Sequence, residues 1–137
     1  MDTNCIFCKL AKNEIPSHKI YEDDDFLAFL DVFPSSLGHT LIIPKAHYEN
    51  IFDIPEDTAA NLQRLVVRTA AALKNSLGTG HINILQNNGN AAGQTVFHYH
   101  VHLIPRYEDD SINIRWTTAK HLPEEFSACV DDIKAKF

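Results

Sequence analysis

The chain has 137 residues, of which 45% are apolar and 22% charged, with a net charge of −6 and a pI near 5.7. This composition excludes a disordered chain, and we expect a single domain over residues 1–137. The acidic charge argues against binding to nucleic acid polymers, which needs clustered Lys and Arg. The sequence contains no apolar run of membrane-spanning length and no signal region, so we expect a cytoplasmic protein with no membrane partner.

The first half of the chain predicts a short helix followed by three strands. Residues 6–13 are expected to form the helix, before a turn that contains Pro16. Apolar segments predict β-strands at residues 18–22, 26–31 and 38–44. The third of these strands is almost continuously apolar.

The second half predicts a long helix, two strands and a C-terminal helix. Residues 54–78 carry apolar positions at helical spacing, with an acidic first turn and a terminal glycine. Strands are expected at residues 81–86 and 94–105, and a helix at residues 123–134, with Cys129 as a small core residue. The short connections between strands favour an antiparallel meander of about five strands. We therefore predict an α+β fold with one long helix and a C-terminal helix.

Three histidines alternate with apolar residues in the last predicted strand. Because strand side chains alternate between faces, His98, His100 and His102 should share one face, about 7 Å apart. The opposite face carries four residues expected to be core: Phe97, Tyr99, Val101 and Leu103. Three histidines on one face are poorly explained as ordinary surface residues. A row of imidazoles can bind metal, move protons or attack an electrophile.

The N-terminal pair Cys5 and Cys8 has a spacing that suits two thiolates on one metal ion. Two small buried residues in a first helical turn would explain the pair equally well. His47 and one histidine of the row could complete a closed Cys2His2 tetrahedron. Such a site predicts a structural Zn²⁺ that uses His98 and leaves the other two histidines available for chemistry.

A histidine nucleophile can attack phosphorus and split one displacement into two steps. A backbone carbonyl would hold one ring nitrogen as N–H and direct the other at phosphorus. The polar loop at residues 87–93, followed by Gln94 and Thr95, could bring backbone N–H groups and a hydroxyl to a phosphate. No cluster of Mg²⁺ ligands is evident in the sequence, so a metal–phosphate mechanism ranks lower.

The segment from His98 to Ile104 resembles the motif of the histidine triad (HIT) family, in its Hint-like branch. Four other segments support the resemblance: Cys5–Glu22, Phe29–Asp31, Gly38–His47 and Asn87–Thr95. The resemblance implies a homodimer of α+β protomers that binds purine nucleotides. It also implies hydrolysis of nucleoside phosphoramidates or of dinucleotide polyphosphates.

The resemblance also implies catalytic roles. His100 would be the nucleophile that accepts the nucleoside monophosphate before water does. His102 and Thr95 would contact the phosphate, and Gln94 would assist near the scissile bond. The implied nucleotide-binding residues are Asp31 at the ribose, Phe7, Leu10, Phe29 and Leu30 around the base, and Asn87, Gly93 and Val96 near the phosphate. The implied zinc ligands are Cys5, Cys8, His47 and His98.

The substrate preference stays open at this stage. The leading hypothesis is a hydrolase of purine nucleoside phosphoramidates. The alternatives are a dinucleotide polyphosphate hydrolase, a nucleotidyl transferase, and a nucleotide-binding interaction module with incidental hydrolysis. The segment after Arg106 resembles the longer tails of bacterial members that carry a tryptophan, here Trp116.

Overall fold

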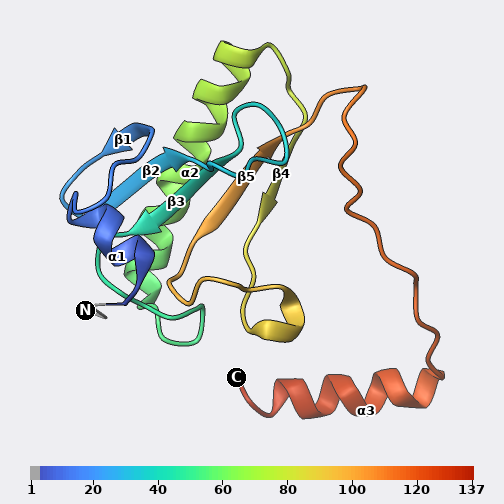
Figure 1. The fold of residues 1–137 in the computed structure, drawn as a ribbon. Helices are drawn as coiled ribbons and strands as arrows, with labels where there is room; N and C mark the ends of the chain where they lie inside the picture. Colours follow the sequence, from blue (N-terminus) through green and yellow to red (C-terminus); the bar gives the residue numbers. More distant parts are fainter. Residues whose placement is uncertain (1–3) are drawn as a thin grey trace.

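The computed structural model describes residues 4–137 and has the predicted α+β architecture (Figure 1). The elements in chain order are α1 (Ile6–Ala11), β1 (Lys19–Glu22), β2 (Phe26–Leu30), β3 (Thr40–Pro44), α2 (Glu56–Leu77), β4 (Ile82–Leu85), the 3-10 turn η1 (Asn90–Ala92), β5 (Val101–Pro105) and α3 (Pro123–Lys134). Each predicted helix and strand is found, with its ends shifted by up to a few residues in all but one case.

The five strands form one open antiparallel sheet, as predicted, in the order β1-β2-β3-β5-β4. The order is consecutive through β3 and then differs from a simple meander, because β5 lies between β3 and β4. The long helix α2 connects β3 to β4, which are not neighbours in the sheet. The chain then returns through the loop before β5 and places β5 between them, in the interior of the sheet.

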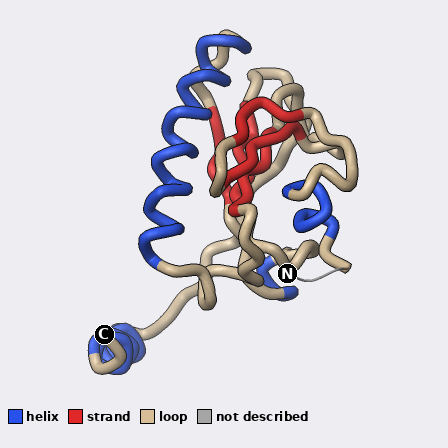
Figure 2. The backbone as a smooth tube through the Cα atoms, turned by 90° about the vertical axis from the view of Figure 1, so that its left-hand side faces the viewer, coloured by secondary structure: helices blue, strands red, loops and turns tan. Residues whose placement is uncertain are grey.

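Both faces of the sheet are covered (Figure 2). On one face, Ala28 of β2 and Ile42 of β3 belong to a buried cluster with Leu62 of α2. On the other face, Leu27 and Ile43 belong to a second cluster that contains the buried side of α1. Strands buried on both faces need apolar residues at consecutive positions, which explains the continuous apolar runs of β2 and β3.

The fifth strand is shorter than predicted. The ladder between β3 and β5 begins at the pair Ile42 and Val101, so residues 94–100 are outside the sheet. The Tyr99 N–H donates instead to the Tyr48 carbonyl, 2.6 Å away. His98 and His100 therefore lie in a loop, and the expectation of three histidines on one strand face is wrong.

Of the four residues expected to be core beside the histidines, Tyr99, Val101 and Leu103 are buried in the main cluster. Phe97 is 38% exposed and lies outside both clusters. The alternation therefore predicts the core correctly from Tyr99 onward. It fails at Phe97 because that residue belongs to the loop.

After β5 the chain forms a C-terminal arm, residues 111–137, that extends away from the sheet and ends in α3 (Figures 1 and 2). Every residue of α3 is exposed, including Cys129, so the expectation that Cys129 is a core residue is wrong. The arm also exposes Trp116 (82%) and Phe126 (61%). None of the helices in residues 4–137 has the length and hydropathy required to cross a membrane.

Candidate active site

The loop before β5 holds His98 in the protein interior. His98 is fully buried, and its Nε2 donates to the Pro44 carbonyl, 2.7 Å away. A neutral imidazole has one N–H group, so Nδ1 of His98 carries the lone pair. Burial lowers the pKa of His98 to about 4, which favours this neutral form.

The lone pair of His98 faces the two cysteines of the N-terminal segment. Nδ1 of His98 lies 3.3 Å from Cys5 Sγ, 3.5 Å from Cys8 Sγ and 3.2 Å from His47 Nδ1. Nδ1 of His47 lies 3.3 Å from Cys8 Sγ. These four side chains are the predicted zinc ligands, and the fold brings all of them together.

The spacing fits a tetrahedral Zn²⁺ site. With Zn–S near 2.3 Å and Zn–N near 2.05 Å, a tetrahedron has S···N edges of about 3.5 Å and N···N edges of about 3.3 Å. The observed separations of 3.3–3.5 Å and 3.2 Å match these edges. The bond from His98 to Pro44 also supplies the outer-shell contact that orients a histidine ligand.

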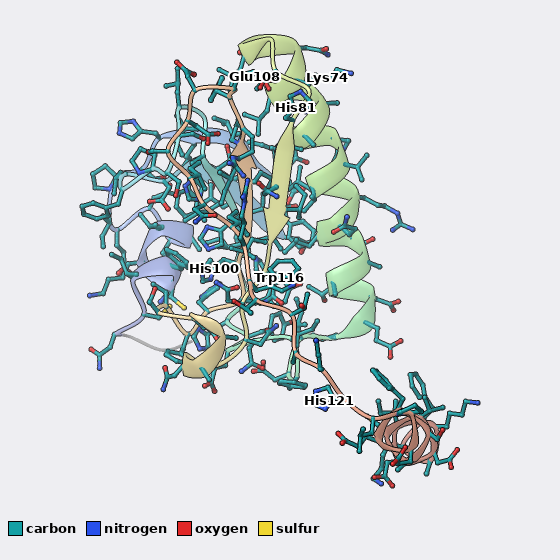
Figure 3. All side chains as sticks on the ribbon, turned by 90° about the vertical axis from the view of Figure 1, so that its right-hand side faces the viewer. Lys74, His81, His100, Glu108, Trp116 and His121 are labelled. Carbon is teal, nitrogen blue, oxygen red and sulfur yellow. The ribbon has the colours of Figure 1, made fainter. Side chains whose placement is uncertain are left out.

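His100 is held by the backbone of His98. Its Nδ1–H donates to the His98 carbonyl, 2.7 Å away, so its Nε2 carries the lone pair. Burial lowers the pKa of His100, and the bond to the carbonyl opposes the shift. His100 lies in the body of the molecule and projects from the loop toward the side of the sheet that carries α1 (Figure 3).

His102 is the only histidine of the three that belongs to β5, and it pairs with Leu41 of β3. The ring centroids of His100 and His102 are 5.0 Å apart. Burial, together with the neighbouring imidazoles of His100 and His39, lowers the pKa of His102 to about 4, against the opposing effect of the Asp31 carboxylate. At neutral pH both His100 and His102 are therefore uncharged.

A cavity of about 400 Å³ lies between α1, β2 and the histidines. Its volume is in the range of small-molecule sites. Nine predicted site residues line it: Phe7, Leu10, Phe29, Leu30, Asp31, Thr95, Val96, His100 and His102. Aromatic contacts make part of the wall, because Phe7 meets Phe29 edge-on at 5.7 Å and His100 at 5.1 Å. The cavity thus combines an apolar wall with a carboxylate, a hydroxyl and two neutral imidazoles.

Among the predicted catalytic and nucleotide-binding residues, three do not line this cavity. Gln94 is buried, and its side chain accepts from the Gly89 N–H and donates to the carbonyls of Glu49 and Val96. Gly93 has a φ of +88°, and a Cβ there would lie 3.6 Å from the Asn87 amide nitrogen. These three residues, Gln94, Gly93 and Asn87, hold or adjoin the loop that leads to Thr95.

Several residues of the site were not predicted from the sequence. Ile15, Ser17 and Phe33 also line the cavity. His39 is buried, and its Nε2 lies 2.9 Å from Nδ1 of His102. A polar residue at the start of an almost entirely apolar strand was the signal that could have identified His39.

A comparison with known proteins identifies the family. The model of the HIT domain matches residues 12–109. The adenosine 5′-monophosphoramidase hnt1 of Schizosaccharomyces pombe is 38% identical over 134 residues, which are 97% of this chain and 98% of the relative.

Two solved structures are similar along nearly the whole chain. A HIT family protein from Bacillus subtilis has a TM-score of 0.92 and 41% identity, covering 98% of this chain and 97% of its own. A Zn-bound histidine triad family protein from Mycobacterium smegmatis has a TM-score of 0.77 and 35% identity, covering 98% of each chain. The chain described here therefore belongs to the HIT domain family.

Proposed function

We propose that this nucleotide hydrolase of the histidine triad type cleaves purine nucleoside phosphoramidates, with His100 as the nucleophile. The observation that supports the proposal best is the bond from Nδ1–H of His100 to the His98 carbonyl. It leaves the Nε2 lone pair on a neutral, buried imidazole at the wall of the cavity. A named phosphoramidase among the relatives supports this choice of substrate.

The nucleoside would use the apolar and acidic parts of the cavity. Phe7, Leu10, Phe29 and Leu30 would enclose the base, and Asp31 would accept hydrogen bonds from the ribose hydroxyls. The Asp31 carboxylate is suited to this role because one of its oxygens accepts from the Phe33 N–H and so has a fixed direction. The phosphate would then lie near Thr95 and the two imidazoles.

The reaction would proceed in two displacements. Nε2 of His100 forms a bond to phosphorus while the P–N bond to the leaving amine breaks, and the amine departs with a proton taken from solvent. Water then attacks the nucleotidyl-histidine, which releases the nucleoside monophosphate and restores His100. An N–H from His102, the Thr95 hydroxyl and the Val96 backbone would stabilise charge on the phosphate oxygens.

The remaining predicted residues would shape the site. Gln94 and Gly93 would fix the loop that carries Thr95, and Asn87 would lie on the leaving-group side. A bound Zn²⁺ would be held by Cys5, Cys8, His47 and His98, and with four protein ligands it would have no open position for substrate. Its contribution would be a structural cross-link between α1 and the loop that carries His100.

We also propose that the protein is a homodimer. No residue of α3 is buried, yet the Bacillus subtilis structure matches 98% of the chain with a TM-score of 0.92. That coverage includes α3, so the arm has a similar position in that structure. A second copy of the chain that covers the apolar side of α3 would explain why α3 has the same position in both structures although no residue of α3 is buried in a single chain.

The test is steady-state hydrolysis of adenosine 5′-phosphoramidate beside diadenosine tetraphosphate, with His100→Ala as the variant. We expect the phosphoramidate to be preferred. His100→Ala should abolish turnover and leave adenosine monophosphate binding largely intact, because the variant removes the nucleophile and keeps the rest of the cavity.

Other outcomes would redirect the proposal. Turnover by His100→Ala near the wild-type rate would contradict the assignment of the nucleophile. A preference for diadenosine tetraphosphate would favour a dinucleotide polyphosphate hydrolase with the same nucleophile. Tight binding of adenosine monophosphate without turnover of either substrate would favour a nucleotide-binding module.

A further inference from the structure

We propose that His39 is a positioning residue that sets the tautomer of His102, so that His102 presents an N–H group to the substrate phosphate. The inference deepens the proposed function and rests on it for the identity of the ligand. Its basis is a chain of three hydrogen-bonding groups that begins at a backbone amide.

The chain begins at Ser35. The Ser35 N–H donates to Nδ1 of His39, 3.0 Å away. A backbone amide can only donate at its nitrogen, so Nδ1 of His39 must carry a lone pair. His39 is 4% exposed, and burial lowers its pKa, so it is neutral at pH 7. Its single N–H group is therefore on Nε2.

The proton on His39 determines the next bond. Nε2 of His39 lies 2.9 Å from Nδ1 of His102, and because Nε2 is the donor, Nδ1 of His102 is the acceptor. The neutral His102 then carries its N–H on Nε2. The Asp31 carboxylate, 3.7 Å from Nε2 of His39, is consistent with a proton at that nitrogen.

The two histidines of the site consequently offer opposite groups at Nε2. His100 has its proton on Nδ1, where it donates to the His98 carbonyl, and presents a lone pair at Nε2. His102 has its proton on Nε2 and presents a donor. The ring centroids of His100 and His102 are 5.0 Å apart, so a nucleophile and a hydrogen-bond donor lie next to each other at the wall of the cavity. This pairing suits attack on phosphorus with a donor for a phosphate oxygen.

The same groups could be read as a second metal site, because ligand atoms of Asp31, His39 and His102 lie within 4.8 Å of one another. The Ser35 amide argues against that reading. A metal on Nε2 of a neutral His39 would require the proton on Nδ1, where it would meet the Ser35 N–H. At the cluster of Cys5 and Cys8, by contrast, the lone pair of His98 faces the other ligands.

The test measures the tautomer of His102 directly in the zinc-loaded 137-residue protein. Long-range ¹H–¹⁵N correlation spectra with ¹⁵N-labelled histidine distinguish protonated from unprotonated ring nitrogens. Wild-type His102 should have its proton on Nε2. In His39→Leu the donor to Nδ1 of His102 is lost. The Asp31 carboxylate, which lies within 4.8 Å, would then favour an N–H group at Nδ1, so we expect the His102 proton to move from Nε2 to Nδ1.

Activity provides the second readout. We expect His39→Leu to lower kcat at least about tenfold, since it withdraws one donor from the phosphate. His39→Gln is the matched control, because its amide nitrogen can replace the Nε2 donor. It should keep the His102 tautomer and a kcat near the wild-type value, which a purely space-filling role of His39 would not predict.

Three results would overturn the proposal. One is a wild-type His102 with its proton on Nδ1, which is decisive even where His39→Leu does not fold. The second is a His39→Leu protein with unchanged tautomer and kcat. The third is a folded His39→Gln protein that loses the tautomer and activity together. The tautomer is measured without substrate, so failure of the wild type to hydrolyse phosphoramidates would refute the proposed function and leave this test standing.

Discussion

At the scale of single residues, the site depends on which nitrogen of each imidazole carries the proton. His98, His100 and His102 share a sequence pattern, yet each has a different partner: the Pro44 carbonyl, the His98 carbonyl and His39. These partners distinguish the proposed metal ligand His98, the proposed nucleophile His100 and the proposed hydrogen-bond donor His102. Burial keeps all three histidines neutral near pH 7, because a charged imidazole would lack the solvation that it has in water.

The Asp31 carboxylate provides a prediction about ribose recognition. We expect Asp31→Asn to weaken binding of adenosine monophosphate about tenfold, because a charged acceptor makes stronger hydrogen bonds than an amide. Titration calorimetry with adenosine monophosphate and its 2′,3′-dideoxy analogue measures the effect. The wild type should distinguish the two ligands more strongly than the variant does. Equal discrimination by both proteins would remove Asp31 from the ribose site.

The low pKa of His102 gives a prediction about acid stability. The pKa is about 4 in the folded protein and near 6.5 in the unfolded chain. Between these values the unfolded chain binds a proton that the folded protein excludes, so the free energy of unfolding falls as pH falls from 6.5 to 4. His102→Gln should reduce this dependence in urea unfolding at pH 7 and pH 5. His121→Gln, on the exposed arm, is the control, and an equal effect of both variants would refute the assignment.

At the scale of elements, the short helix α1 illustrates how packing compensates for length. Six residues are too few for a stable isolated helix. Phe7, Cys8 and Leu10 are buried against the sheet, and Cys5 accepts from the Cys8 N–H at the helix N-terminus. The proposed zinc ligands would join this helix to two loops, the one after β3 that carries His47 and the one before β5 that carries His98. One side of the cavity therefore depends on how firmly α1 is held.

Removal of zinc should consequently destabilise the protein. A ligand that binds only the folded state at 1,000 times its Kd contributes about 4 kcal/mol. We expect a chelator to lower the free energy of unfolding by an amount of this order, measured by urea unfolding of the zinc-loaded protein. Cys8→Ser should abolish the response to chelator, whereas Cys129→Ser on the exposed helix should retain it. Identical unfolding of the wild type with and without chelator would contradict a structural metal.

At the scale of the whole molecule, the body that contains the sheet and the C-terminal arm differ in how many of their apolar residues are buried. The body has two buried clusters on the two faces of the sheet. The arm is anchored at its base by Arg106, which donates to both oxygens of Asp110 and to the Ile112 carbonyl. Beyond that point it exposes Trp116 and the apolar residues of α3. Exposed apolar residues on a helix that also carries charged residues are typical of an interaction surface.

The arm gives a prediction about assembly. Deletion of residues 115–137 keeps the Arg106 anchor and removes α3, so we expect the body to retain its fold by circular dichroism. The dissociation constant of the dimer should rise at least about tenfold, since the apolar contact area is lost. Sedimentation equilibrium of the full chain and the truncated chain measures it. An unchanged dissociation constant would show that the arm has another role.

The residue pattern along the chain was sufficient to predict the α+β class, the approximate positions of the helices and strands, and the four residues of the Cys/His cluster. Local patterns carry this information: strands buried on both faces are continuously apolar, and α2 ends at Gly78 because that position has a φ of +72°. Likewise, nine residues predicted for the site do line one cavity.

The pairing of strands and the hydrogen-bond partners of residues far apart in the sequence became known from the three-dimensional structure. The alternation of histidines predicted a strand from residue 94, but β3 offers ladder partners only from Val101 onward. The position of β5 between β3 and β4 likewise depends on which strands pair with one another. The partner of His102 comes from a segment 63 residues earlier in the chain. Hydrogen-bond partners of this kind depend on how the strands pair, which residue patterns along the chain do not encode.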